Sequence, residues 1–336
     1  MKQSATDSNG VGAAQHSRPL TPISIYPKRR SPVNQHNRRV IVSVAAVVMA
    51  GLAMASPVLA GPRPVTAHYA FTTVDFPDST STDLLGFLTR TMVGQFTDGE
   101  GNTHGWLLSA PGGTFGQFDV PGAWSTSLSA INHSGQFGGV YRDDPAHPLR
   151  RHGVLVVGDV LTTIDYPGST RTSLVQMNDR GQAVGIGRIP SEGATTPYGF
   201  VWKDGVFTDV SFPGAFGTGL DGINEQGDVC GFTTDEAGGL THAMMRVKGV
   251  FSQVEPPGAL DSIALCINDR GQVAGWYDDA GGNTHGFIYS GGVFTTIDVP
   301  GAPASEVTSI GNDGLITGDY VGADGADHGF IGTPNH

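Results

Sequence analysis

The sequence predicts an all-β protein built as a six-bladed β-propeller, and three observations support this. Glycine accounts for 50 of the 336 residues and proline for 21, and these are the two poorest helix formers. Only 15% of the residues are charged, whereas 38% are hydrophobic, which is enough for a sizeable core. Three short phrases also recur in fixed order along the chain, about every 43 to 46 residues. A repeat of this length, with four short strands in each unit, is typical of propeller blades.

The first phrase, FTTIDVPG in one clear copy, predicts a strand that ends at a Pro-Gly turn. Its six prolines are spaced by 44, 46, 46, 44 and 43 residues and stand at 77, 121, 167, 213, 257 and 300. Four copies carry an aspartate two residues before the proline, at Asp75, Asp119, Asp165 and Asp298. Ser211 and Glu255 replace it in the other two. We expect these acids to accept backbone N–H groups near the turn.

The second phrase, QMNDRGQAVG in one copy, reads as a strand, a tight turn and a second strand. Its asparagines are predicted to cap the turn through their side chains. They are Asn132, Asn178, Asn224 and Asn268. Gly311 takes this place in the sixth repeat, and the first repeat keeps only an eroded copy.

The third phrase is His-Gly-Phe in its commonest form, and it starts another strand. Its five histidines are His104, His152, His242, His285 and His328, with Tyr198 in the remaining repeat. A ring of ligands is one interpretation of these histidines. Equivalent places on successive blades are far apart unless they face the channel, so we expect each histidine to make a structural hydrogen bond to a neighbouring strand or loop.

The positions of the turns set the order of strands within a blade. We call the strand that leads into the second phrase the Ile-Asn strand, because it ends at Ile-Asn in copies such as CINDRG, and we call the strand of the first phrase the FTTID strand. The loosest connection runs from each Pro-Gly turn to the next Ile-Asn strand, as in PGAPASEVTSI. In a propeller this link crosses between blades, so the Ile-Asn strand should be innermost and the FTTID strand outermost. The chain then starts with an outer strand, 71–76, which can complete the last blade beside 328–331 and remove an exposed edge. An open β-solenoid is the alternative.

The first 60 residues are predicted to be an address rather than part of the fold. Two basic clusters precede an uncharged stretch, 40–60, that ends in small residues, as in a secretory signal cleaved near Ala60. An uncleaved membrane anchor is the alternative, since the stretch is long enough to span a bilayer. We therefore expect a secreted, periplasmic or cell-surface protein. The predicted parts are the address at 1–60, a linker at 61–70, the propeller at 71–332 and a tail at 333–336.

Charge and cysteine content narrow the partners. The first 60 residues hold seven of the 19 Lys and Arg residues and one of the 31 acids, so the remainder carries 12 bases and 30 acids, a net of −18. We expect no basic patch and no nucleic-acid partner, because nucleic-acid binding depends on neutralising phosphates. Cations or a carbohydrate surface fit better. The two cysteines, Cys230 and Cys266, form either one disulfide or a pair of buried thiols.

Acidic loops and aromatic residues are the remaining candidates for binding. Asp98, Glu100 and Asn102 place oxygens at alternate positions, as at the start of a calcium loop, although the downstream bidentate Glu is missing. Ordinary solvated turns are the alternative. The aromatic residues near turns either stack on sugars or pack between blades. They include Trp124, Tyr141, Trp276 and Tyr277.

The three phrases together make the chain similar to the bacterial extracellular HAF-repeat family, named for a His-Ala-Phe phrase. The resemblance covers residues 71–332, with His242-Ala243-Met244 the copy that keeps Ala. It implies export and a repeat fold, and it implies no established activity, so no catalytic residue is carried over.

The sequence carries no Gly-x-Ser-x-Gly, His-Glu-x-x-His, Cys-x-x-Cys or phosphate-loop motif. We therefore favour a monomeric binding or interaction module over an enzyme, with a glycan or an envelope component as its ligand. An extracellular polysaccharide hydrolase or lyase and a purely structural surface protein are the alternatives. Apart from calcium, no cofactor is expected, and membrane association is expected only if the address is retained as an anchor.

Overall fold

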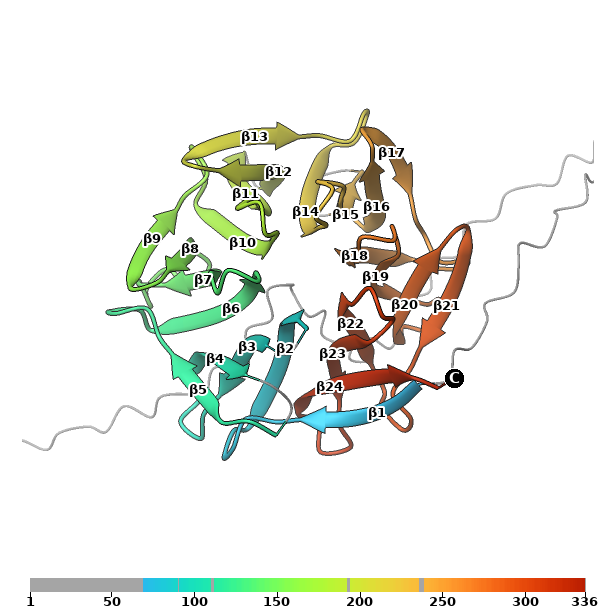
Figure 1. Cartoon of the computed structure of the whole chain (residues 1–336). Helices are drawn as coiled ribbons and strands as arrows, with labels where there is room; N and C mark the ends of the chain where they lie inside the picture. Colours follow the sequence, from blue (N-terminus) through green and yellow to red (C-terminus); the bar gives the residue numbers. More distant parts are fainter. Residues whose placement is uncertain (1–68, 90, 110–111, 192–193, 236–238, 336) are drawn as a thin grey trace, which may run out of the picture.

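The computed structural model describes residues 69–89, 91–109, 112–191, 194–235 and 239–335, which form a ring of six four-stranded blades (Figure 1). All hydrogen-bonded strands within a blade are antiparallel. One parallel pair, Thr103 with Ser125, joins the sheets of the first two blades. The six-bladed propeller is confirmed, and the solenoid alternative is wrong.

Blades 1 to 5 each take four consecutive strands, starting at β2, β6, β10, β14 and β18, and blade 6 combines β22–β24 with β1. The strands are β1 (Tyr69–Val74), β2 (Ser81–Leu88), β3 (Thr91–Thr97), β4 (Thr103–Ser109), β5 (Phe115–Phe118), β6 (Ser125–Ile131), β7 (Phe137–Arg142), β8 (His152–Val157), β9 (Val160–Ile164), β10 (Arg171–Met177), β11 (Ala183–Ser191), β12 (Ala194–Lys203), β13 (Val206–Val210), β14 (Gly217–Ile223), β15 (Val229–Thr234), β16 (Thr241–Val247), β17 (Val250–Gln253), β18 (Asp261–Ile267), β19 (Val273–Asp278), β20 (Thr284–Ser290), β21 (Val293–Ile297), β22 (Ser305–Ile310), β23 (Ile316–Val321) and β24 (Asp327–Pro334).

The predicted order of strands within a blade is also confirmed. The strands that precede the Ile-Asn turns surround the axis, and the FTTID-type strands lie at the rim (Figure 1). Antiparallel pairing then divides the connections between two faces of the ring. We call one the Asn face, which carries the Ile-Asn turns and the rim hairpins. The other is the loop face, which carries the loops between second and third strands and the Pro-Gly links between blades.

The N-terminal strand closes the ring. Strand β1 pairs with β24 in antiparallel register from Tyr69 opposite Pro334 to Val74 opposite Gly329. The hydroxyl of Thr308 in blade 6 also donates to the carbonyl of Leu84 in blade 1 at 2.6 Å. Together these contacts join the two ends of the chain into one ring, as the phasing of the repeats predicts.

Each inner strand carries a β-bulge at the same place, and each bulge explains a repeated glycine. The six bulged residues line a narrow axial cavity of about 20 Å³, and they are Leu85, Ser129, Val175, Asp221, Leu265 and Thr308. On the neighbouring strand, a Cβ added to the last glycine of the second phrase would meet an inner-strand carbonyl oxygen at 1.9–2.1 Å. These glycines are Gly94, Gly139, Gly185, Gly231, Gly275 and Gly318. Only glycine permits this close backbone approach.

The core lies between the blades, and the third phrase supplies much of it. The last residue of that phrase is fully buried in all six repeats, as Trp106, Val154, Phe200, Met244, Phe287 and Phe330. Burying a large apolar side chain contributes roughly 1.5–3 kcal/mol. The same position on each blade therefore fastens the third strand to its neighbours.

The cysteines are free buried thiols rather than a disulfide. Cys230 packs with Val254 and Ala264, whereas Cys266 packs in another cluster, with Val307 and Ile310. Burial raises the pKa of both thiols, that of Cys266 to about 12.

The described part of the chain contains no helix with the length and hydrophobicity that a membrane span requires. The predicted address at 1–60 lies outside the described residues.

Candidate binding face

The five repeat histidines lie at the loop-face ends of their third strands, and each ring nitrogen meets a carboxylate. The Nδ1 atom of His104 lies 2.9 Å from Asp119, and its Nε2 atom lies 3.3 Å from Asp98. His285 lies in the same way between Asp298 at 2.8 Å and Asp279 at 3.4 Å. We call this arrangement the histidine clamp, because it ties the rim strand of a blade to the loop on its inner side.

The other three clamps have the same partners in their own blades. His152 lies 2.9 Å from Asp165 and 3.4 Å from Asp143, and His328 lies 3.0 Å from Asp75 and 3.3 Å from Asp324. His242 contacts Glu255 and lies 3.0 Å from Asp235. The predicted structural hydrogen bond is confirmed for all five histidines.

The carboxylates raise the pKa of three of these rings. Burial lowers the pKa of His242, His285 and His328, but hydrogen bonds and charge attraction from the two acids outweigh it, so each pKa is raised. In three blades a tyrosine ring stacks on the imidazole, for example Tyr277 on His285 at 5.2 Å between ring centroids. The clamps of His242, His285 and His328 therefore favour a charged imidazolium held between two anions.

The sequence predicts that the repeat acids accept backbone N–H groups near the Pro-Gly turns, and the structure does not show this for the described residues. Asp75, Asp119, Asp165 and Asp298 instead pair with histidine. The backbone N–H one residue after each acid is bonded by a hydroxyl from the next inner strand, as Val120 donates to Thr126 at 3.0 Å. The same bond recurs at Thr82, Thr172, Thr218 and Ser305. The missed signal is a Thr or Ser five residues after each repeat proline.

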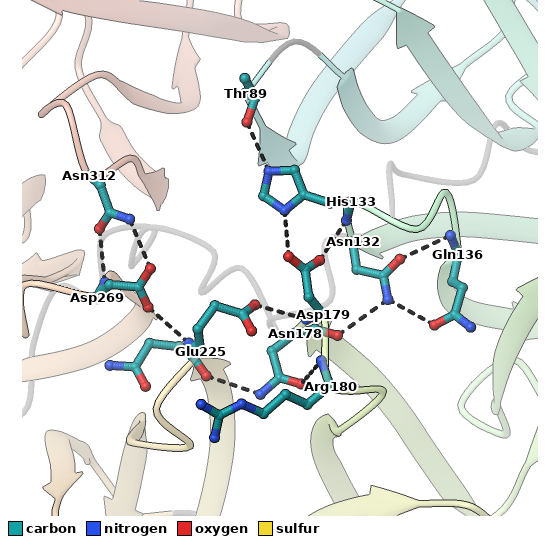
Figure 2. Close-up of polar contacts among 11 residues, drawn as sticks. Thr89, Asn132, His133, Gln136, Asn178, Asp179, Arg180, Glu225, Asp269 and Asn312 are labelled. Atoms are coloured by element: carbon teal, nitrogen blue, oxygen red, sulfur yellow. Dashed lines mark hydrogen bonds and ion pairs between the residues drawn. The ribbon is translucent and has the colours of Figure 1, made fainter.

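The repeat asparagines cap their turns as predicted, and they also connect the blades. The Oδ1 atom of Asn178 accepts the N–H groups of Arg180 and Gln182, both at 3.1 Å. Its Nδ2 atom donates to the carbonyl of Asn224 in the next blade at 3.0 Å (Figure 2). Asn132, Asn224 and Asn268 repeat this link at 3.1–3.2 Å.

A second ladder runs beside the first on the Asn face. The residue after each asparagine donates its N–H to a side chain of the next blade, as His133 does to Asp179 at 2.7 Å (Figure 2). Asp179 donates likewise to Glu225, Glu225 to Asp269 and Asp269 to Asn312. These polar groups are thus engaged in holding neighbouring blades together.

The predicted calcium loop has the geometry of a capped turn. One oxygen of Asp98 accepts the N–H groups of Glu100 and Asn102, and the other accepts the Asn102 side chain and faces His104. Burial opposes the shift, but these bonds lower the pKa of Asp98 to about 2. Asp279 is held similarly, chiefly by Asn283, and has a pKa of about 2. Calcium binding at Asp98, Glu100 and Asn102 stays a prediction, which calcium titration of thermal unfolding tests.

Three buried acids between blades 6 and 1 were not anticipated. Carboxylate oxygens of Asp83, Asp319 and Asp327 lie within 4.8 Å of one another. The side-chain amide of Gln95 donates to Asp83 at 2.5 Å, and the Ser81 hydroxyl donates to Asp327 at 3.4 Å. The three acids come from different strands without a common phrase, so only the fold brings them together.

Blade 3 lacks the histidine clamp. Tyr198 stands in place of the histidine and Ser211 in place of the rim acid, so both partners are lost together. Tyr198 stacks on Tyr166 at 6.2 Å between ring centroids, and Tyr166 in turn donates to Asp209 at 2.8 Å. The regular pattern of the loop face is therefore interrupted at blade 3.

Arginines gather beside this interruption, which corrects the expectation of no basic patch. Arg171 at the start of β10 is the register partner of Arg188 on β11 and forms a parallel bridge with Arg151 of blade 2. Arg150 lies next to this bridge. Arg142 is on the face of β7 that points to blade 3, because side chains alternate along a strand and Gly138, four residues earlier, contacts Leu174 of blade 3. Among the described residues, four of the 12 basic residues after position 60 therefore lie along this seam, namely Arg142, Arg150, Arg151 and Arg171.

A pocket of about 620 Å³ opens on the loop face over the same seam. It is lined by the loop between β7 and β8 and by the link that enters β10, through Asp144, Ala146, His147, Pro148, Leu149, Arg150, Ser169, Thr170 and Arg171. Asp144 is already bonded within its own loop, to the N–H of Ala146 at 2.9 Å and to the His147 ring at 2.6 Å. These bonds lower the pKa of Asp144.

Exposed apolar side chains lie on both faces of the ring, and one set shares the loop face with the pocket. The described large hydrophobic residues with high exposure fall into two sets. Valines at the rim hairpins form the first set, on the Asn face, and they are Val157, Val160, Val206, Val250 and Val293. The second set lies on the loop face of blades 2 to 5, and its members are Leu149, Tyr198, Phe216, Leu240 and Leu260.

The aromatic residues singled out in the sequence pack between strands and blades. Tyr141 and Tyr277 stack on clamp histidines, and Trp276 packs against the core cluster of Phe232 and Ile263. Trp124 lies under the guanidinium of Arg142, 6.0 Å from the ring centroid. The exposed aromatic residues are instead Tyr198 and Phe216, which the repeat pattern indicates only as departures from it.

No family model matches the chain, and no curated protein matches it. Among solved structures, the β-propeller domain of the Trilobed protease from Pyrococcus furiosus is 11% identical, with 73% of this chain and 76% of that chain covered and a TM-score of 0.47. The six-bladed fungal lectin of Aleuria aurantia, described with a mode of fucose recognition, is 10% identical, with 79% and 91% covered and a TM-score of 0.45. YCF48 bound to D1 peptide is 10% identical, with 84% and 100% covered and a TM-score of 0.43. These likenesses concern the fold alone.

Proposed function

We propose that the protein is a binding module that holds a glycan on the loop face of blades 2 to 4. The observation that carries the proposal is the coincidence of three features at one place. The repeat pattern is broken at Tyr198 and Ser211, a pocket of about 620 Å³ lies over the adjacent seam, and exposed apolar side chains lie on the same face, with Leu149 in the pocket lining. Pockets that bind small molecules have volumes of about 300–1,000 Å³.

The surface favours a sugar over an apolar ligand. Tyr198 is 38% exposed and Phe216 is 43% exposed, and polar loops separate them from Leu149. Pro197, the residue before Tyr198, lies against Gly217, the residue after Phe216, whereas the Tyr198 ring is on the opposite face of β12 and stacks on Tyr166. Aromatic rings set among polar groups suit sugar rings, which present apolar C–H faces and polar edges. The predicted export signal is consistent with an extracellular glycan.

A glycan array tests this function with two matched double variants of the full-length protein. Tyr198→Ser with Phe216→Ser removes the aromatic pair on the loop face. Val206→Ser with Val250→Ser removes two valines of 64% and 68% exposure on the Asn face. We expect the first to weaken glycan binding at least tenfold and the second to leave it unchanged.

Thermal unfolding of each variant checks the fold, and Phe216→Ser alone serves if the double variant unfolds. The proposal is wrong if the wild-type protein binds no glycan on the array. It is also wrong if both double variants bind as tightly as the wild type.

A further inference from the structure

We propose that the seam pocket between blades 2 and 3 recognises the oxyanion groups of an acidic glycan, carboxylate or sulfate, through Arg150 and Arg171. This inference rests on the proposed function and names its ligand class. The pocket has two arginines in its wall, and Leu149 and Pro148 form an apolar side next to them. A charged sugar offers the matching pair of groups, an anion and an apolar ring face.

Arg142, Arg150 and Arg171 lack acidic partners. Among the described residues, the ion pairs of the loop face join histidines to acids, and none involves these three arginines. The nearest acids are engaged elsewhere, since Asp143 faces His152 at 3.4 Å and Asp144 faces His147 at 2.6 Å. An incoming anion therefore meets arginines that are free to bind it.

Arg142 is a buried positive charge at this seam, and its burial is unfavourable for the stability of the fold. Its side chain is only 5% exposed, its one side-chain hydrogen bond is to the Ser125 hydroxyl at 3.3 Å, and its Nε atom has no partner. Burial lowers the pKa of Arg142 to about 10. Removing a cation from water without a counter-ion is unfavourable. A bound anion at the seam would offset part of this cost.

The loop face of blade 3 continues the pocket into a path for a polymer. Arg171, Arg188 and Pro197 are register partners across β10, β11 and β12. Adjacent strands are about 4.8 Å apart, so this row extends roughly 10 Å from the pocket. Pro197 lies against Gly217 of blade 4, the residue after Phe216, and Tyr198 is on the opposite face of β12. The row thus leads from the pocket to β12, with the exposed Tyr198 on one side and Phe216 on the other.

An acidic glycan fits the rest of the molecule better than nucleic acid. The chain after residue 60 carries a net charge of −18, which repels a densely charged phosphate backbone. An acidic glycan carries at most about one charge on each sugar and also presents apolar ring faces. Arginine binds a carboxylate or sulfate through paired N–H donors, so a few residues suffice for recognition.

Binding assays with four polymers test the inference on the full-length protein. The probes are polygalacturonate, dextran sulfate, neutral dextran and duplex DNA. Arg150→Gln with Arg171→Gln removes two charges from the pocket, and Lys203→Gln with Lys248→Gln removes two exposed charges from the Asn face. We expect the arginine variant to weaken binding of polygalacturonate or dextran sulfate at least tenfold, and the lysine variant to change it less than twofold.

The arms of this experiment separate the possible failures. Preference for one of the two charged glycans identifies carboxylate or sulfate as the recognised group. Neutral dextran bound equally by all variants overturns the inference and leaves the proposed function intact. Duplex DNA bound as tightly as the charged glycans overturns the ligand class. Failure of all four polymers, together with a blank glycan array, overturns both proposals.

Discussion

Blade 3 and the other five blades have the same strands, the same bulge and the same buried phrase residue, but their loop faces differ. In the five, a histidine is held between two acids, as His285 is by Asp298 and Asp279. In blade 3, Tyr198 and Ser211 replace the pair, and the neighbouring surface holds a pocket lined by Arg150 and Arg171. The clamp thus fills the loop face with internal contacts, and its loss leaves side chains available for a ligand.

The difference separates two kinds of repeated residue. The close-approach glycine and a buried large apolar residue at the end of the third phrase recur in blade 3 because the propeller needs them in every blade. The histidine and its acid form a unit that one blade can lose without losing its fold. A departure from the repeat is therefore more informative about binding than the repeat itself.

The largest effect is expected where blade 3 and the others do not differ. Gly185→Ala in blade 3 and Gly275→Ala in blade 5 each bring a Cβ to 2.0 Å from an inner-strand carbonyl. Both should lower the free energy of unfolding by a similar amount, about 3 kcal/mol or more. Chemical denaturation measures this. A mild effect in blade 3 alone would mean that its bulge is less constrained than those of the other blades.

A smaller effect is expected from exchanging the clamp. His285→Tyr with Asp298→Ser makes blade 5 resemble blade 3 and should lower stability by about 1 kcal/mol, since the pair is charged but partly solvated. Tyr198→His with Ser211→Asp makes the opposite change in blade 3. That variant should retain the fold and lose glycan binding, measured by denaturation and on the array. Equal glycan binding by the second variant would contradict a role for the interruption.

Replacing the buried cation should have a slight effect with an informative sign. Arg142→Met keeps a flexible unbranched side chain and removes a charge that no acid compensates. We expect stability to stay the same or rise by about 1 kcal/mol at neutral pH, and acidic-glycan binding to weaken. Arg246→Met is the control, because Arg246 lies over Phe251 in blade 4, away from the seam. A large loss of stability in Arg142→Met would mean that the charge serves the fold.

The smallest expected effect is a pH dependence that blade 3 lacks. The raised pKa values of His242, His285 and His328 lie above about 6.5, the value for an unfolded chain. Their stabilisation is therefore complete below about pH 6.5 and is lost as the pH rises through the folded values. The midpoint of thermal unfolding should fall over that range, and less steeply in His285→Gln. An identical slope in His285→Gln would rule out this clamp as the source.

Most of the fold followed from the sequence because its signals are periodic. Six spaced prolines, the loose inter-blade link and the strand order determine the propeller and its closure by β1. The hydroxyls at Thr126 and its equivalents, and the close approach at Gly185, were missed because they depend on where adjacent strands meet rather than on a local pattern. The aspartates were assigned to the nearest turn, although their partners lie 13 to 15 residues away within a blade, or across the closure at His328.

The candidate site was much harder to predict, for the same reason. Charge counting predicted no basic patch, since 12 bases are outnumbered by 30 acids in the chain after residue 60. Arg142, Arg151 and Arg171 come together only because two blades pack side by side. Tyr198 was visible in the sequence as a departure, and the structure shows that the departure lies next to the arginines.

Strand β1 is the first strand of the propeller to be synthesised. It is also the last to find its partner, because it closes the ring. About 250 residues separate β1 from β24, and contacts so distant in sequence form slowly because a long loop must close first. Until β24 emerges, β1 and the edge of blade 6 remain unpaired strand edges, the kind that recruit other chains. The ring therefore gains a sealed edge in its native state and carries an aggregation risk until β24 has been made and has paired with β1.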